Sequence, residues 1–497
     1  MPSRPSRPRR VVLTAALAAG ALVGTVPWLI APAASAAPTV CPPPLDERAA
    51  PDYDGDFAAD LTVGVPTGLV GGVPTGAVDI HYAQGRAQRV GPASFIGIPA
   101  AAGDLFGASV ESLPPDQTAD SCDDLAIGAP GSDRGRGAVV IAHGSLTGLT
   151  SAGAVRLTGR SAGERFGASI ALGSASADTT SYDLYVGAPN RTVSGRAGAG
   201  AVDIYRVQKA TGAATYLGAV TEDTPGVPGV AEAGDHFGTV LAFSDTLAVG
   251  VPDETSGSHR QAGDVVLVKT STTGAVTAAR LLQQGYQGLP GVAETGDRVG
   301  AALSWSGDAL WVGEPGEAIG RAAGAGQVQV FRSAWVSRSS GDVGTITQNT
   351  YAVPGTVQAG DHFGASVNAQ GNLCSAQAAA VGSPGEDIGS VRDAGEVTIV
   401  LSVAGANACQ RSYHQGPGGG LGGAAEAGDQ VGAALSALNP WDSLDLVVGI
   451  PGEGVGSSAH AGGVTVVHPG LAPRSYGDSA GRVTNSRYGA VLEPSAW

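Results

Sequence analysis

The chain has 497 residues, of which 43% are hydrophobic and 14% charged, and its formal net charge at pH 7 is −16. An acidic chain of this kind argues against a nucleic-acid partner and against binding to an anionic membrane surface. Glycine contributes 78 residues, more than double its usual share, which predicts many turns if the sequence is repetitive.

The first 36 residues predict an export signal. Several arginines precede an apolar run over residues 11–30, and a small-residue cleavage site follows and ends at Ala36. The Arg9-Arg10 pair leaves twin-arginine export open beside the ordinary secretory route. We expect a secreted, extracellular protein with a lead-in segment over residues 37–51. The rest of the sequence has no run of eighteen apolar residues, so we expect no membrane span.

An acidic stretch follows the lead-in segment. Its carboxylates occupy relative positions 1, 3, 5 and 9, at Asp52, Asp54, Asp56 and Asp60. Four anions this close repel one another unless a hard cation neutralises them, and Ca²⁺ accepts six to eight oxygen ligands with flexible geometry. The stretch therefore predicts a calcium site, and the alternative is a solvated acidic loop.

A second stretch has the same spacing but one charge fewer, so we expect weaker binding there. Its ligands would be Asp116, Thr118, Asp120 and Asp124.

Two short motifs recur along the chain. The segment 233–252 contains both, with a Phe-Gly turn that opens one apolar run and a Gly-x-Pro motif that ends the next. Alternating small and β-branched residues between Gly and Pro are typical of short strands. Gly-x-Pro begins at Gly64, Gly128, Gly187, Gly250, Gly313, Gly382 and Gly449. Phe-Gly or its equivalent begins at Phe106, Phe166, Phe237, Val299, Phe363, Val431 and Tyr488.

These motifs resemble the FG-GAP repeats of integrin α subunits and of many secreted bacterial proteins, over about residues 52–492. The resemblance implies an all-β fold, a seven-bladed β-propeller of four-stranded antiparallel blades over residues 52–497. The first and last segments of the chain would share one blade and close the ring. It also implies that the backbone carbonyl of Ala58 binds the calcium ion. Phe57 departs from the family, which usually has glycine there.

Four cysteines in an exported chain favour disulfides. The repeat register places Cys122 in the loop between the first two strands of blade two, and Cys41 leads into the corresponding loop of blade one. It places Cys374 and Cys409 on the same face of the sixth blade. We therefore predict the pairs Cys41–Cys122 and Cys374–Cys409. A zinc site is the alternative, but the chain lacks the close cysteine spacing that such sites use.

The loops after Gly-x-Pro and before Phe-Gly are expected to share one face of the ring, where the resemblance implies a ligand. The candidate residues are Arg134, Arg136, Arg191, Arg196, Arg260, Arg321 and Arg392. The alternative is that these charges only keep the protein soluble. The acidic residue before each Phe-Gly, such as Asp235, is expected to bind backbone amides in its turn. Asn190 begins a formal N-glycosylation sequon.

These features favour a calcium-binding adhesion or recognition module for a protein or surface polysaccharide ligand, which we expect to be a monomer without enzyme activity. Two alternatives stay open, a hydrolase or phospholipase-associated accessory, and a purely structural envelope protein. A Gly-x-Ser-x-Gly pattern occurs at residues 477–481. It lacks the strand-turn-helix context of a hydrolase, so we interpret it as coincidence.

Overall fold

The structure is a computed structural model, and it describes residues 51–95, 100–114, 122–174, 180–209, 211–286, 290–333, 335, 343–369, 378–401, 410–438, 445–468, 470–478 and 483–493. These residues lie in the compact unit Thr39–Trp497. Some predictions concern residues outside this part of the chain and stay predictions. They cover the export signal with Ala36, residues 37–50, Asp116, Thr118, Asp120, Cys41, Cys374 and Cys409.

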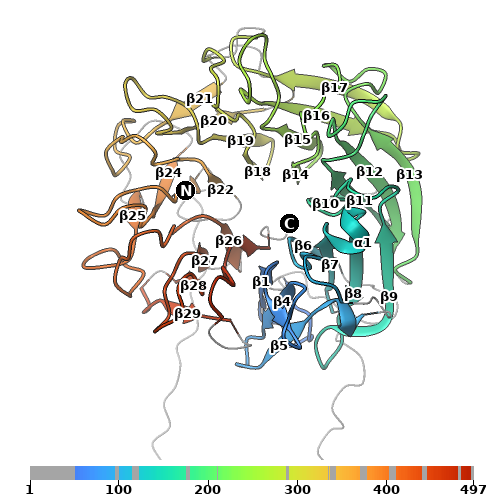
Figure 1. Cartoon of the computed structure of the whole chain (residues 1–497), viewed down its shortest axis with the longest axis horizontal. Coiled ribbons are helices and arrows are strands. Elements are labelled where there is room, and N and C mark those ends of the chain that lie inside the picture. Colours follow the sequence, from blue (N-terminus) through green and yellow to red (C-terminus); the bar gives the residue numbers. More distant parts are fainter. Residues whose placement is uncertain are drawn as a thin grey trace, which may run out of the picture. The chain divides into compact units, whose positions relative to one another are not determined.

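Seven four-stranded antiparallel sheets form a β-propeller, as predicted (Figure 1). From the innermost strand outward, blade one consists of β30 (Val491–Leu492), β1 (Leu61–Val65), β4 (Ala77–His81) and β5 (Ala87–Val90). Blade two consists of β6 (Ser109–Leu113), β7 (Asp124–Ala129), β8 (Ala138–His143) and β9 (Thr150–Thr158). Blade three consists of β10 (Ile170–Ser174), β11 (Ser181–Ala188), β12 (Ala201–Gln208) and β13 (Ala214–Val220).

The remaining blades repeat this order. Blade four consists of β14 (Val240–Phe243), β15 (Leu247–Val251), β16 (Asp264–Thr270) and β17 (Val276–Leu282). Blade five consists of β18 (Ala302–Ser306), β19 (Ala309–Glu314), β20 (Gln327–Phe331) and β21 (Val343–Ile346). Blade six consists of β22 (Ser366–Asn368), β23 (Ala378–Ser383), β24 (Glu396–Leu401) and β25 (Arg411–Tyr413). Blade seven consists of β26 (Leu435–Leu438), β27 (Asp445–Ile450), β28 (Gly463–Val467) and β29 (Arg474–Tyr476).

Three small elements were not expected from the repeat pattern. A hairpin of β2 (Leu69–Val70) and β3 (Val73–Pro74) lies in the loop between the second and third strands of blade one. A single turn of 3₁₀ helix covers Pro92–Ser94, and the short helix α1 covers Ser132–Gly135.

The two motifs of the repeat meet across every junction between blades. A Cβ atom added to Gly250, in the Gly-x-Pro motif of blade four, would lie only 2.2 Å from the carbonyl oxygen of Gly300, in the motif that opens blade five. The corresponding distance is 2.0 to 2.2 Å at all seven junctions. Real Cβ atoms do not approach an oxygen this closely, so the first glycine is required by its neighbour's backbone.

The residue before the glycine of the Phe-Gly motif also stabilises this junction, through a backbone hydrogen bond. The Phe237 N–H donates to the carbonyl oxygen of Ala199 in blade three at 3.0 Å, and the equivalent bond is 2.9 to 3.2 Å at all seven junctions. The side chain at this position is at most 4% exposed in every blade. Each blade therefore inserts one apolar side chain against its predecessor, and Val299 and Val431 replace the aromatic ring without loss of the bond.

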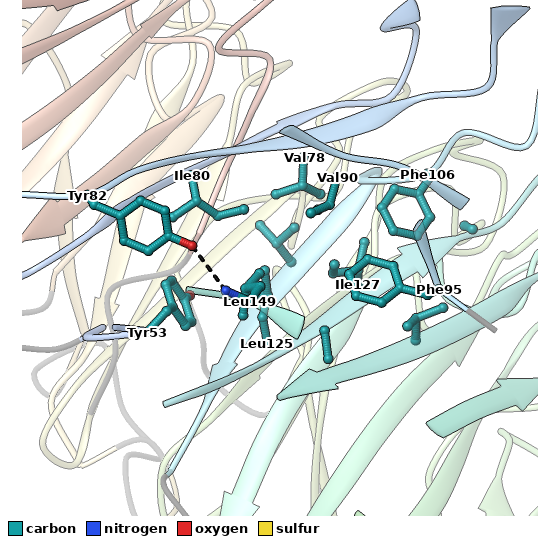
Figure 2. Close-up of a cluster of buried hydrophobic side chains, with 14 residues drawn as sticks. Tyr53, Val78, Ile80, Tyr82, Val90, Phe95, Phe106, Leu125, Ile127 and Leu149 are labelled. Carbon is teal, nitrogen blue, oxygen red and sulfur yellow. Dashed lines mark hydrogen bonds between the residues drawn. The ribbon is translucent and has the colours of Figure 1, made fainter. Parts of the chain in front are cut away.

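The hydrophobic core lies between the blades. Figure 2 shows the cluster between blades one and two, where Ile80 and Val90 face Leu125 and Ile127, and all four are buried. Burial of each such side chain contributes about 1.5–3 kcal/mol. A hydrogen bond from the Leu149 N–H to the Tyr82 hydroxyl, 3.1 Å long, crosses the same junction.

The two ends of the described chain close the ring, as predicted. β30 pairs with β1, with Val63 opposite Leu492. The Tyr53 hydroxyl donates to Glu493 Oε2 at 2.9 Å, and both residues are buried. Because Tyr53 lies in the acidic stretch, the lead-in to the first blade is tied directly to the last strand.

A single methyl group tests the junction. Gly250→Ala places a Cβ against the Gly300 carbonyl, so we expect a loss of about 1–3 kcal/mol of stability, measured by urea unfolding. Gly218→Ala, also within a strand, is the matched control because the nearest atom to its Cβ would be 3.9 Å away. Equal stability for the two variants would contradict the close-approach argument.

Candidate functional site

Three predicted calcium ligands converge in the stretch before β1. Side-chain oxygens of Asp52, Asp54 and Asp60 lie within 4.8 Å of one another. Asp52 and Asp60 are buried, and Asp54 Oδ1 is a buried oxygen without a hydrogen-bond partner. Such an oxygen is expected in a site shaped to bind a cation, so the donor set fits Ca²⁺.

The Asp52 carboxylate shapes the loop. It accepts the N–H groups of Gly55 at 2.7 Å, Asp56 at 3.2 Å and Phe57 at 3.0 Å. Gly55 and Phe57 both have left-handed backbone conformations, with φ of 71° and 65°. Phe57 thus adopts the left-handed conformation that glycine adopts without strain.

Asp56 and Ala58 have other contacts. Asp56 Oδ1 accepts the Ala58 N–H at 2.8 Å, and Oδ2 accepts from Gln84 Nε2 at 3.1 Å. Asp56 is therefore not among the three residues whose carboxylates converge. The role of the Ala58 carbonyl stays a prediction.

Asp60 is a buried carboxylate with a strongly raised pKa. Burial raises its pKa to about 8, and the charges of Asp54, Asp52 and Asp56 act in the same direction. Hydrogen bonds from the N–H groups of Tyr53 at 2.8 Å and Ala83 at 3.3 Å compensate only in part. An ion beside Asp60 would remove this penalty.

The other blades show what distinguishes blade one. At the position of Asp60, blades two, three and seven also have a carboxylate, which pairs with a basic residue at the end of the third strand. The residue next in register to Asp60 is instead the neutral Tyr82. Arg86 supplies one charge, 2.9 Å from Asp54 Oδ2. The pairs in blades two, three and seven are Asp124–His143 at 2.9 Å, Asp183–Arg206 at 2.8 Å and Asp445–His468 at 2.5 Å.

The second predicted calcium loop is described only at its last residue. Asp124 Oδ2 lies 2.9 Å from His143 Nδ1, and Oδ1 accepts the Gly144 N–H at 3.0 Å. Because both oxygens are already bonded within the protein, Asp124 offers less to a metal than Asp60 does.

Cys122 lies next to the first loop and is disulfide-bonded and buried. Its neighbour Asp123 exchanges two bonds with Asp52, each 2.8 Å long, one through its carboxylate and one through its backbone N–H. Blade two therefore holds the start of the acidic loop. The pairing of Cys122 with Cys41 stays a prediction, since Cys41 lies outside the described residues.

The opposite face carries the loops that follow Gly-x-Pro. Five of them contain the same tight turn, in which two residues exchange backbone bonds, as Ser256 and His259 do at 3.0 and 3.1 Å. These turns give the loop tips a fixed backbone. The turns join Val193 to Arg196, Ser256 to His259, Ile319 to Ala322, Ile388 to Val391, and Val455 to Ser458.

The predicted ligand-face arginines differ in their surroundings. Arg191 is 11% exposed and contacts Asp203 at 2.6 Å and Glu164 at 3.0 Å, so it braces its own blade. Two others form exposed ion pairs, Arg136 with Asp133 at 2.9 Å and Arg196 with Asp223 at 3.0 Å. The side chains of Arg134, Arg260, Arg321 and Arg392 are exposed.

A further set of residues on this face was missed. The residue before each Phe-Gly motif has φ between 50° and 60° at all seven junctions, and five of the seven are basic. These residues lie in the turns that lead into the innermost strands. In the sequence these residues occupy the variable position x of Gly-Asp-x-Phe-Gly, and their mainly basic character could have been recognised there. The seven are Leu105, Arg165, His236, Arg298, His362, Gln430 and Arg487.

An acidic residue precedes six of these seven positions, and those described next have the expected structural role. Asp361 Oδ2 accepts the Gln358 N–H and Asp297 Oδ2 accepts the Glu294 N–H, both at 2.6 Å. Asp104 and Asp429 make the same contact three residues back. These carboxylates are buried and fix the turn.

No protein-family profile matches the chain, and no curated protein matches it. Among solved structures, TolB from Acinetobacter baumannii is 11% identical with a TM-score of 0.34, over 73% of this chain and 63% of TolB. Two putative 6-phosphogluconolactonases, from Bacteroides uniformis and Bacteroides fragilis, are 10% identical with a TM-score of 0.34. They match 74% and 82% of this chain over 81% and 77% of their own. Similarity at this level assigns no activity.

Within the described ranges, none of the helices is long and apolar enough to cross a membrane.

Phe57 offers a test of the loop geometry. Phe57→Gly removes a side chain that is 42% exposed and relieves its left-handed conformation, so we expect unfolding to require up to about 1 kcal/mol more. Phe57→Ala keeps the conformational penalty and serves as the control. Thermal unfolding measures both, and equal midpoints for the two variants would argue against strain at this position.

Proposed function

We propose that this protein is a secreted recognition propeller of the FG-GAP type, in which calcium braces the loop of Asp52, Asp54 and Asp60. The observation that carries the calcium proposal is the lack of a basic cross-strand partner for Asp60. In blades two, three and seven the equivalent carboxylate lies against a histidine or arginine of the third strand. Blade one has Tyr82 in that register, and Asp54 has an unpartnered buried oxygen.

A structural calcium ion in this loop would also support ring closure. Tyr53 follows the first ligand directly, and its hydroxyl bonds to Glu493 beside β30. The ion is therefore expected to stabilise the blade that the two ends of the chain share.

The opposite face supports the recognition proposal. It combines hydrogen-bonded turns, exposed arginines and the mainly basic left-handed residues before the Phe-Gly motifs. A chain with a net charge of −16 that gathers basic groups on one face is suited to an anionic partner. We propose an anionic surface polysaccharide as ligand, with an acidic protein surface as the second possibility.

Thermal unfolding in calcium and in chelator tests the metal proposal. We expect calcium at one hundred times its Kd to stabilise the wild type by about 2.7 kcal/mol and so to raise its midpoint of thermal unfolding. Asp54→Ala combined with Asp56→Ala should lose most of that response. Asp445→Ala is the control, because this carboxylate in blade seven is paired with His468. A double variant with the full wild-type response would contradict the proposal.

Co-sedimentation with insoluble peptidoglycan, with and without its attached anionic polymers, tests recognition. We expect retention by the polymer-bearing material only, and several-fold weaker retention of Arg260→Ala combined with Arg392→Ala. The control removes two exposed arginines from outer strands, Arg411 and Arg474. Retention by neither material would favour the structural-protein alternative.

A further inference from the structure

A second acidic cluster lies at the junction of blades three and four, on the face opposite the Asp52–Asp60 loop. Glu222 follows β13, Asp235 precedes the Phe-Gly motif of blade four, and Glu254 follows its Gly-x-Pro motif. One carboxylate oxygen from each of the three lies within 4.8 Å of those of the others. Glu222 is 3% and Asp235 2% exposed, and Glu254 is half-buried.

At the next three junctions, the position equivalent to Glu222 is occupied by a different residue. In each, glutamine takes the place of Glu222, and its Nε2 donates to Oε2 of the glutamate that follows Gly-x-Pro. An amide donor thus satisfies a carboxylate acceptor at each of these junctions. The pairs are Gln284–Glu317 at 2.9 Å, Gln348–Glu386 at 2.6 Å and Gln415–Glu453 at 2.7 Å.

Glu222 occupies the position of these glutamines but lacks their amide N–H donor. A Cβ on Gly229 would lie 2.8 Å from Glu222 Oε1, as a Cβ on Gly291 would lie 2.9 Å from Gln284 Nε2. A carboxylate oxygen has therefore replaced the amide nitrogen. Glu254 Oε2, whose counterparts all accept that amide, is a buried oxygen without a partner.

Two more unpartnered oxygens lie in the same environment. They are Glu222 Oε2 and Oδ1 of Asp264, the first residue of β16, which is 3% exposed. The amide oxygen of Gln284 is also unpartnered, so Glu254 Oε2 is the atom that sets this junction apart. Four carboxylates are thus gathered at one junction with too few donors to satisfy them.

The raised pKa values of these carboxylates agree with the shortage of hydrogen-bond donors. Burial, followed by the charges of Glu254 and Asp264, raises the pKa of Glu222 to about 10. Burial, followed by Asp264 and Asp235, raises the pKa of Glu254 to about 9. His236 is the basic group acting on Asp235, and its Nδ1 is already 2.8 Å from Asp253 Oδ2. Buried carboxylates in this state need a cation or bound protons.

We propose that Glu222, Asp235 and Glu254 bind a calcium ion that joins blades three and four. Ca²⁺ accepts six to eight oxygen ligands at about 2.3–2.6 Å with flexible geometry, so three carboxylate oxygens within 4.8 Å of one another can bind it together with water. Mg²⁺, at about 2.0–2.1 Å, requires a tighter octahedral set. Half-buried Glu254 leaves one side open for water ligands.

This site is independent of the Asp52–Asp60 loop and of the proposed recognition function. The ion would do at this junction what the glutamine amide does at the next three, since it supplies the positive partner for the glutamate after Gly-x-Pro. It would therefore brace the face on which the ligand is proposed to bind.

The test is Glu222→Gln, which installs the residue found at the three other junctions and so is expected to fold. Calorimetric titration with CaCl₂ should give one bound ion per chain fewer than for the wild type. In chelator, Glu222→Gln should melt at a higher temperature than the wild type, because the introduced amide can donate to Glu254. Calcium should then raise the melting temperature of Glu222→Gln by less than it raises that of the wild type.

Gln348→Glu is the matched gain-of-site variant. It places a carboxylate beside Glu386, with Asp361 and Glu396 close enough to raise the pKa of Glu386 by their charges. We expect a lower midpoint in chelator, one additional bound calcium ion and recovery of the midpoint in calcium.

An unchanged number of calcium ions in Glu222→Gln would overturn the proposal. A higher midpoint in chelator with that unchanged number would point to a proton shared between Glu222 and Asp235. Asp54→Ala combined with Asp56→Ala, titrated in parallel, reports on the blade-one loop alone. Failure of one site is thus distinguished from failure of the other.

Discussion

At each of the seven junctions, the backbone carbonyl of one blade occupies the space where a side chain of the preceding blade would lie. This contact explains why both motifs recur in phase, because the glycine of Gly-x-Pro and the glycine of Phe-Gly form one interface. A buried apolar side chain and a backbone hydrogen bond complete it. Since the glycine-to-carbonyl contact involves only backbone atoms and glycine, it recurs at all seven junctions although the other residues of the blades differ.

Function in such a ring is expected where a blade departs from its own repeat. Blade one has Tyr82 where blades two, three and seven have histidine or arginine, so Asp60 lacks the basic partner that its equivalents in those three blades have. The junction of blades three and four has Glu222 where the next three have glutamine. Both departures leave buried carboxylates short of positive partners, and a hard cation is the simplest way to satisfy them.

The two faces of the propeller divide the proposed roles. One face carries the acidic loop, which is bonded to blade two through Asp123 and to the last strand through Glu493. The other carries the hydrogen-bonded turns after Gly-x-Pro and the left-handed residues before the Phe-Gly motifs. Left-handed conformations of non-glycine residues are strained, and their recurrence at every junction is compatible with a surface preorganised for binding.

The sequence by itself determined the number of blades, the closure through Tyr488 and strands such as Glu396–Leu401, because all three follow from local spacing of glycine, proline and apolar residues. It also indicated the convergence of Asp52, Asp54 and Asp60, which are close along the chain. Only the tertiary structure decided that Asp124 pairs with His143, that Arg191 is held by Asp203, and that Glu222 meets Glu254. These contacts join residues from different strands and blades, and no local pattern encodes which charged side chains will meet there.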